Sequence, residues 1–427
     1  MIDAAGTPTA AKLRSRRERL RRRTLRMLAL FYVLMLLPLV ADAHGERAQM
    51  PQLRMSTVHW FDIEVSTTRL DVNDEIVVKG SFMPSRFWPE HVESIEGTAF
   101  LNIGVPGPSF VRLDSRVNGV PMIRSTRFMR GELYHFEMRL KARKPGRYHV
   151  HPLINVKGTG PIIGPGRWVE VGGNAADFRL EATTLLGQKI DLEHYGFANA
   201  AWWSLFWFVF GLSWFVYWLL ECPIVIPRFK RRDELGVDAD QMITKADRRF
   251  AFIYLTLTLS FIVGGYQYAQ ASYPITTPLQ TGRVNVPPAE RPAPTVKVEM
   301  VEARYRIPGR SFRIELKVTN SGNSAVTVGE LAAGNLRFVN AAVSKVVPAD
   351  EDDLVAADSL RVENGPVQPS ETRNIVIYAD DAMWETQRMT TMIKSPDANV
   401  AAMLFFYGAD GERHIVEIGG PMIPVFG

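Results

Sequence analysis

Residues 310–319 read RSFRIELKVT, and apolar and polar side chains alternate along almost the whole stretch. A period of two is typical of a β-strand that buries one face. The next five residues, NSGNS at 320–324, are turn formers. This pattern predicts a β-domain over residues 295–427. Runs such as 75–79 and 134–140 predict another over residues 44–195, and each domain is expected to be a small antiparallel sandwich or barrel.

Two uncharged stretches lie between these β-domains and predict transmembrane helices, at residues 196–221 and 250–271. Each is long enough to cross a bilayer. The loop between them, residues 222–249, carries seven Lys or Arg residues, and a short basic loop belongs on the cytoplasmic side. Both β-domains are then expected outside. Residues 272–294, Pro-rich toward their end, are expected to form a stiff linker to the second β-domain.

Four tryptophans of the first helix, Trp203, Trp207, Trp214 and Trp218, are spaced by four, seven and four residues. This spacing places them on one helical face. Either they face lipid, or they pack against helices of another membrane protein chain, because an apolar stripe alone does not distinguish these environments.

The N-terminal residues 1–43 have the pattern of a cleaved signal peptide. Nine Lys or Arg residues lie within 12–26, a fourteen-residue apolar run follows, and residues 41–43 read ADA. An uncleaved anchor is the alternative, but a membrane span needs about 20 residues. Cleavage after Ala43 would make His44 the first residue of the mature chain.

Charge and cysteine content exclude several classes of function. The leader holds most of the positive charge, so the remaining chain has a net charge of about −1 and no electrostatic support for a nucleic-acid partner. The single cysteine, Cys222, excludes internal disulfides and thiolate metal sites in the two β-domains. Phosphate-binding loops and nucleophile-elbow motifs are absent from the sequence.

Histidines suggest a metal site instead. A terminal His44 offers its α-amine and its imidazole, which together can chelate one metal ion. His149 and His151 form an H-x-H pair in a strand-like stretch, where residues two apart face the same way. Such a nitrogen-rich set suits copper. The alternative is a pair of solvated histidines; His135, in another alternating strand, is expected to be solvated.

Several stretches of the mature chain resemble the B-type component of the copper membrane monooxygenases, the family of particulate methane, ammonia and short-alkane monooxygenases. The resemblance covers essentially the whole mature chain. The stretches are HGE at 44–46, VHWFD at 58–62, FLNIG at 100–104, PGP at 106–108, KPGRYHVH at 144–151, GPIIGPG at 160–166, TLLGQ at 184–188 and YPITTPLQ at 273–280.

The resemblance implies two cupredoxin-like domains joined by two transmembrane helices. It implies a copper site of His44, His149 and His151, and in some members a second site, which here would use His59 and His414. It also implies assembly with membrane subunits A and C as a trimer of heterotrimers. The complex would lie in the bacterial cytoplasmic or an intracytoplasmic membrane, with both β-domains on the periplasmic side.

The activity that the resemblance implies is hydroxylation of methane, ammonia or a short alkane with O₂. Two hypotheses remain for this chain: it holds the oxidising copper, or it is a copper-binding scaffold or electron-relay subunit with the active metal in a partner subunit. A free periplasmic copper carrier is a weaker third, because a carrier needs at most one anchor.

Overall fold

The computed structural model describes residues 49–184, 186–221, 225–273, 282–307, 311–346, 353–394, 399–409 and 411–426. Two compact units divide the chain, residues 1–48 and residues 49–427, and the description concerns the second. The predicted signal peptide, His44 and Cys222 therefore lie outside the described residues.

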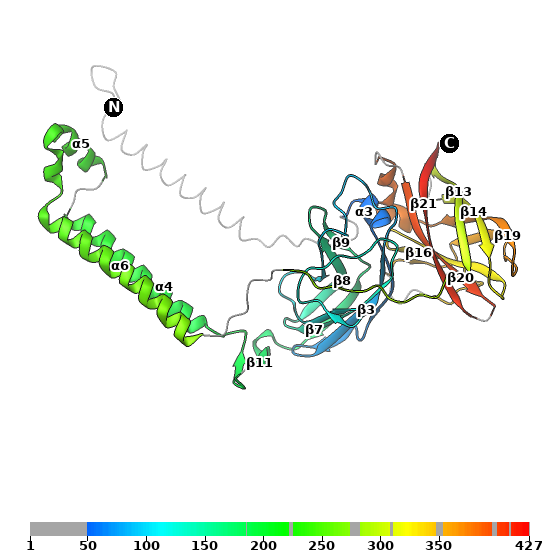
Figure 1. Cartoon of the computed structure of the whole chain (residues 1–427), viewed down its shortest axis with the longest axis horizontal. Coiled ribbons are helices and arrows are strands. Elements are labelled where there is room, and N and C mark those ends of the chain that lie inside the picture. Colours follow the sequence, from blue (N-terminus) through cyan, green and yellow to red (C-terminus); the bar gives the residue numbers. More distant parts are fainter. Residues whose placement is uncertain are drawn as a thin grey trace, which may run out of the picture. The chain divides into compact units, whose positions relative to one another are not determined.

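The N-terminal β-domain consists of two sheets packed face to face (Figure 1). The first, in spatial order, is β1 (Val58–Val65), β3 (Glu75–Pro84), β7 (Tyr134–Ala142), β5 (Phe110–Val117) and β6 (Val120–Pro121). The second is β2 (Arg69–Asp71), β10 (Arg167–Gly172), β8 (Gly146–Val156) and β4 (Ala99–Gly104), with β9 (Gly160–Ile163) paired to β8. All pairs are antiparallel except β2 with β10.

Alternation along the strands builds the core of this domain. In β7, Tyr134, Phe136, Met138 and Leu140 are buried, whereas His135 points outward and is exposed, as the sequence predicted. The aromatic rings pack closely, with Phe82 stacked on Tyr134 at a centroid distance of 5.3 Å. A short hairpin of β11 (Glu181–Thr183) and β12 (Lys189–Asp191) follows the domain.

Two helices, α4 (Phe197–Glu221) and α6 (Lys245–Ser272), are long and apolar enough to cross a membrane. They are joined by α5 (Val225–Leu235) and a 3₁₀ segment, Gly236–Met242. A capping box between Thr244 and Asp247 starts α6. The buried Asp247 carboxylate also accepts a hydrogen bond from the Tyr217 hydroxyl at 3.0 Å, which ties this end of α6 to α4.

The tryptophan stripe of α4 packs partly against α6, an arrangement that the spacing alone did not reveal. Trp214 lies against Phe250, with ring centroids 5.6 Å apart, and against Tyr254 at 4.8 Å. Trp203 and Trp207 line a hollow between the two helices opposite Gly265. Much of the stripe is thus used to hold the hairpin together.

The C-terminal β-domain is one nine-stranded sheet within the described residues. Its order is β17 (Val355–Ala356), β16 (Leu336–Val339), β15 (Val326–Ala333), β20 (Asn399–Gly408), β21 (Arg413–Phe426), β13 (Val296–Ile307), β14 (Ser311–Asn320), β19 (Thr372–Asp380) and β18 (Leu360–Glu363). The alternating stretch that predicted this domain is β14, which buries Phe312, Ile314, Leu316 and Val318.

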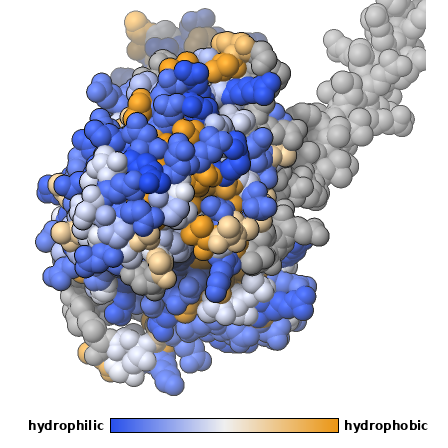
Figure 2. All heavy atoms as spheres, turned by 90° about the vertical axis from the view of Figure 1, so that its right-hand side faces the viewer, coloured by the Kyte–Doolittle hydropathy of each residue, from blue (hydrophilic) through white to orange (hydrophobic). Residues whose placement is uncertain are grey.

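The long strand β21 connects the two halves of that sheet. Residues 413–421 pair with β20, and residues 422–426 pair with β13. The change of partner falls next to Gly420, whose φ of 153° is unfavourable for a residue with a Cβ. The water-facing character of the β-structure is visible in Figure 2, where the surface is mostly hydrophilic with a limited apolar patch.

Contacts between distant residues join the two β-domains. Helix α3 (Pro51–Ser56) inserts Met55 into the core of the C-terminal domain, and buried Arg54 donates hydrogen bonds to the carbonyls of Gln387 and Gly334, both at 2.8 Å. An apolar cluster that includes Phe61 and Phe405 lies between the domains. The predicted fold class, mainly β with two β-domains joined by two membrane-type helices, is confirmed.

Candidate metal centre

Strand β8 carries the H-x-H pair on one face and core residues on the other. Val150 is buried in the domain core, so His149 and His151 both point to the opposite face. In the register, His149 lies opposite Trp168 of β10, and His151 lies opposite Gly104 of β4. The pair therefore sits in the middle of its sheet rather than at an edge.

The two imidazoles are close and buried. Their ring centroids are 4.3 Å apart with an interplanar angle of 78°, and the residues are 8% and 5% exposed. They are not the solvated histidines of the alternative interpretation. Two imidazoles side by side in a buried position are an arrangement that a shared metal ion stabilises.

A hydrogen bond orients the second imidazole. His151 Nδ1 lies 3.1 Å from the carbonyl oxygen of Gly164, and since a carbonyl only accepts, Nδ1 carries the proton. In neutral imidazole Nε2 then holds the lone pair and is the nitrogen that can bind a metal. Metal-binding histidines commonly donate their other N–H to a backbone carbonyl in this way.

The loop over the pair makes room for both rings through a glycine. A Cβ at Gly166 would lie 2.5 Å from His151 Nδ1 and 3.0 Å from His149 Cε1, closer than real Cβ atoms tolerate. The sequence marked residues 158–166 only as a loop. A glycine repeat facing an H-x-H strand was the available signal, but the facing itself required the tertiary structure.

A further residue that the sequence did not single out, Gln49, anchors the chain near this loop. Its Nε2 donates to the Pro161 carbonyl at 2.7 Å, and its Oε1 accepts from the Ile163 amide at 3.1 Å. Gln49 is thus held on β9, one residue before Gly164. It follows His44 by five residues.

The predicted second site places its two histidines in different surroundings. His59 is buried, and its Nε2 lies 3.1 Å from Glu417 Oε1, whereas His414 Nδ1 lies 3.3 Å from the Thr295 hydroxyl. On β21, residues 414 and 417 are three apart and point to opposite faces. The structure therefore joins His59 with Glu417, and a site of His59 and His414 stays a prediction.

Glu417 is held as a carboxylate at this contact. Burial by itself would raise its pKa, but hydrogen bonds from His59, from the Ser85 hydroxyl at 2.6 Å and from the Arg86 amide keep the pKa below its ordinary value. These groups come from both β-domains, so the charge belongs to the domain interface.

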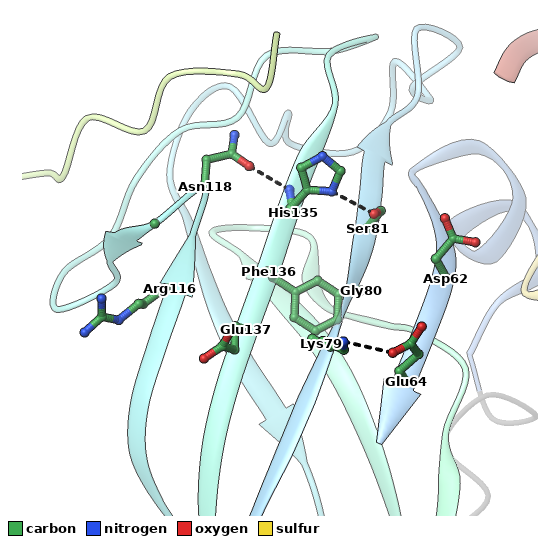
Figure 3. Close-up of a pocket in the computed structure, with 11 residues that line it drawn as sticks. Asp62, Glu64, Lys79, Gly80, Ser81, Arg116, Asn118, His135, Phe136 and Glu137 are labelled. Carbon is green, nitrogen blue, oxygen red and sulfur yellow. Dashed lines mark hydrogen bonds and ion pairs between the residues drawn. The ribbon is translucent and has the colours of Figure 1, made fainter. Parts of the chain in front are cut away.

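A pocket of about 360 Å³ on the outer face of the first sheet is lined by charged side chains and His135 (Figure 3). Its charges are already paired, for example Lys79 with Glu64 at 3.0 Å. His135 Nδ1 lies 2.9 Å from the Ser81 hydroxyl. This arrangement offers little to a metal ion and makes His135 a suitable control residue.

Among the residues that the structure describes, no cluster of three or more His, Cys, Asp or Glu side chains is spaced to hold a metal ion. The His149–His151 pair nevertheless fits copper by its donor chemistry: two neutral nitrogens, one with a fixed tautomer, under a loop that a Cβ would obstruct.

Comparison with known proteins gives extensive sequence matches. The family model of the monooxygenase B-subunit protein matches residues 45–426. The particulate methane monooxygenase alpha subunit of Methylococcus capsulatus is 42% identical over 388 residues, which cover 90% of this chain and 93% of that protein.

Solved structures give weaker likenesses. The cupredoxin domain of amoB from Nitrosocaldus yellowstonii is 19% identical, with a TM-score of 0.23, and the match covers 29% of this chain and 92% of that domain. A PapD-like domain of human CEP192 is 12% identical, with a TM-score of 0.15, over 35% of this chain and 99% of that domain.

Proposed function

Because this chain belongs to the family of monooxygenase B-subunit proteins, and so is part of a membrane monooxygenase, an oxidoreductase, we propose that it is the copper-binding subunit of that complex. The proposed ligands are His44, His149 and His151. Membership in a multi-subunit enzyme implies partner subunits. We propose that these are membrane subunits A and C, assembled as a trimer of heterotrimers.

The observation that carries this proposal is the buried imidazole pair beside the anchored Gln49. A chain of five residues spans at most about 17 Å. Cleavage after Ala43 would therefore leave the His44 amine and imidazole on a short tether that begins at β9, the strand next to β8. Together the three histidines supply four nitrogen donors.

Each residue of the chain has a distinct role in the proposed site. His151 donates from Nδ1 to Gly164 and presents Nε2, Gly166 leaves space for the rings, and burial keeps water away from the pair. The terminal amine of His44 must lose its proton to bind, so affinity is expected to fall at low pH. Bound copper would supply one-electron redox chemistry.

The proposed reaction of the complex is hydroxylation of a small, poorly reactive substrate. One atom of O₂ enters a C–H or N–H bond, and the other is reduced to water by two electrons and two protons from a donor. The relative from Methylococcus capsulatus is named for methane, and we propose methane, ammonia or a short alkane as the substrate here.

A second candidate role is supported by the burial of the pair. Imidazoles that are 8% and 5% exposed are well shielded, which favours a relay or scaffold subunit that serves an active metal in a partner subunit. A free copper carrier is disfavoured, because two helices long enough to cross a membrane exceed what one anchor requires.

The proposed location is the bacterial cytoplasmic or an intracytoplasmic membrane, with both β-domains on the periplasmic side. The family and the two apolar helices support the membrane location. Exposed cations on α5, namely Lys230, Arg231 and Arg232, support a cytoplasmic position for the loop between the helices.

The decisive experiment replaces His149 and His151 by alanine in the purified complex. Copper content and the Cu(II) electron paramagnetic resonance (EPR) spectrum should lose the contribution of this chain, whereas His135→Ala, the matched control, should change neither. Unchanged copper content in the double variant would refute the proposed site.

Turnover with methane, ammonia and short alkanes separates the two roles. A double variant that assembles and lacks this copper but turns over at the native rate excludes the oxidising copper and supports a scaffold. Greatly reduced turnover supports a site in the reaction path.

A further inference from the structure

The imidazole of His149 is one layer of a three-part stack. Trp168 lies against it with ring centroids 4.7 Å apart and an interplanar angle of 25°. The guanidinium carbon of Arg147 lies over the Trp168 ring at 4.4 Å from its centroid. Arg147, Trp168 and His149 therefore form a continuous cation, indole and imidazole contact.

Strand register explains why these side chains meet. His149 and Trp168 are direct partners in the antiparallel pair of β8 and β10, and Arg147 is two residues before His149 on the same face. A guanidinium over an indole face is attracted by the ring quadrupole. The stack is thus a built feature of the sheet rather than a chance contact of long side chains.

Exposure rises along the stack. His149 is buried, Trp168 is partly buried, and Arg147 is exposed. The other tryptophans of the described β-domains, Trp60, Trp88 and Trp384, are all buried in cores. Trp168 is therefore the tryptophan of the two β-domains that contacts both a proposed copper ligand and the solvent-facing side of the sheet.

The charge beside Trp168 is positive. Among the described residues Arg147 forms no ion pair, whereas Glu170, its register partner, lies 3.5 Å from Arg69. The local sum of these three exposed groups is one positive charge. An anion approaching this part of the sheet would be attracted to the outer layer of the stack.

We propose that Trp168 is the contact through which electrons reach the copper held by His149, and that Arg147 selects an anionic one-electron donor, such as an acidic redox protein. This rests on the proposed copper site. One electron leaves the donor, which is oxidised by one unit, and Cu(II) becomes Cu(I); no bond breaks and no proton moves. The indole serves as the bridge and ends unchanged.

The physical reason is distance. Electron tunnelling falls exponentially with separation, and a stacked indole replaces a gap through solvent or aliphatic packing with one conjugated ring in contact with the ligand. A residue that only packed against His149 would influence copper binding. It would not make the rate of reduction depend on the charge of the donor.

The test measures reduction of bound Cu(II) in the purified membrane complex by rapid mixing and freeze-quench EPR. Two reagents are compared at low ionic strength, anionic hexacyanoferrate(II) and cationic hexaammineruthenium(II). Copper content is determined for each variant, so that loss of the site is distinguished from slow reduction. The variants are Trp168→Leu, Trp168→Phe, Arg147→Gln, and the control Arg69→Gln, which removes a neighbouring exposed cation that is not in the stack.

Trp168→Leu is expected to slow reduction by both reagents, and Trp168→Phe to restore part of the rate. Arg147→Gln should slow the anionic reagent several-fold and not the cationic one, a difference that salt should abolish. Arg69→Gln should have a smaller effect. If Trp168→Leu loses copper, the charge selectivity of Arg147→Gln and the rate of Trp168→Phe decide.

Native rates in copper-loaded Trp168→Leu, or equal effects of Arg147→Gln on both reagents, would overturn the inference while leaving the copper site intact. Wild-type complex without copper on this chain would instead refute the proposed function, and the inference with it.

Discussion

Gly166→Ala is the smallest change that tests the imidazole pair as a metal site. Gly166 does not have a positive φ, so alanine is compatible with its backbone conformation. The effect is therefore steric and local. The new Cβ would lie 2.5 Å from His151 Nδ1, 2.6 Å from His151 Cε1 and 3.0 Å from His149 Cε1.

The size of the effect follows from these distances. Ordinary contacts between non-bonded heavy atoms lie at about 3.5–4.0 Å, so the rings or the loop must move by roughly 1 Å. Metal–ligand distances are defined to within about 0.2 Å. We therefore expect copper affinity to fall by roughly 10- to 100-fold, as when supporting contacts of a metal site are lost. Overpacking should also lower the free energy of unfolding by about 1–3 kcal/mol.

The assay is a competitive chelator titration of the purified complex, together with thermal unfolding. Gly97→Ala is the control, because it adds a methyl group in the same domain, where the nearest atom is the Ser94 carbonyl at 3.2 Å. Wild-type copper affinity and an unchanged EPR spectrum in Gly166→Ala would show that copper does not bind between these rings.

N-terminal sequencing of the membrane-extracted chain should begin at His44, and a chain that retains the leader before Ala43 would contradict the chelating amine. Gln49→Ala removes two hydrogen bonds to β9; copper affinity should fall, while the free energy of unfolding falls by only about 1–2 kcal/mol, and equal chelator titrations would contradict the anchoring role. Asp62→Asn weakens the ion pair with Arg413 that joins the two β-domains. Since both side chains are about one-third exposed, we expect a loss of about 1 kcal/mol in denaturant unfolding and no change in copper content, and a loss of copper would contradict this separation.

The sequence alone was sufficient for features that depend on neighbouring residues. The alternation in residues 310–319 predicted β14, and uncharged stretches predicted α4 and α6, because strand and helix periods are properties of a short segment. The same rule placed His149 and His151 on one face of β8. The family stretches then indicated why that pair matters.

Features that depend on packing between distant segments were not predictable. The tryptophan stripe left lipid and partner helices as alternatives, whereas α6 of the same hairpin packs against much of it. His59 was expected to act with His414, yet its contact in the structure is Glu417. Alternation specifies a face but not which residue of another strand arrives there.

The candidate copper site shows the same division within a few residues. The H-x-H spacing determined that two imidazoles are neighbours. Their burial, the tautomer of His151, the space at Gly166 and the stack on Trp168 were decided only when the loop at 164–166 and strand β10 folded onto β8. A side chain's direction is a local consequence of backbone geometry, but its environment is made by residues far away in the chain, and their positions are set by the packing of the whole domain.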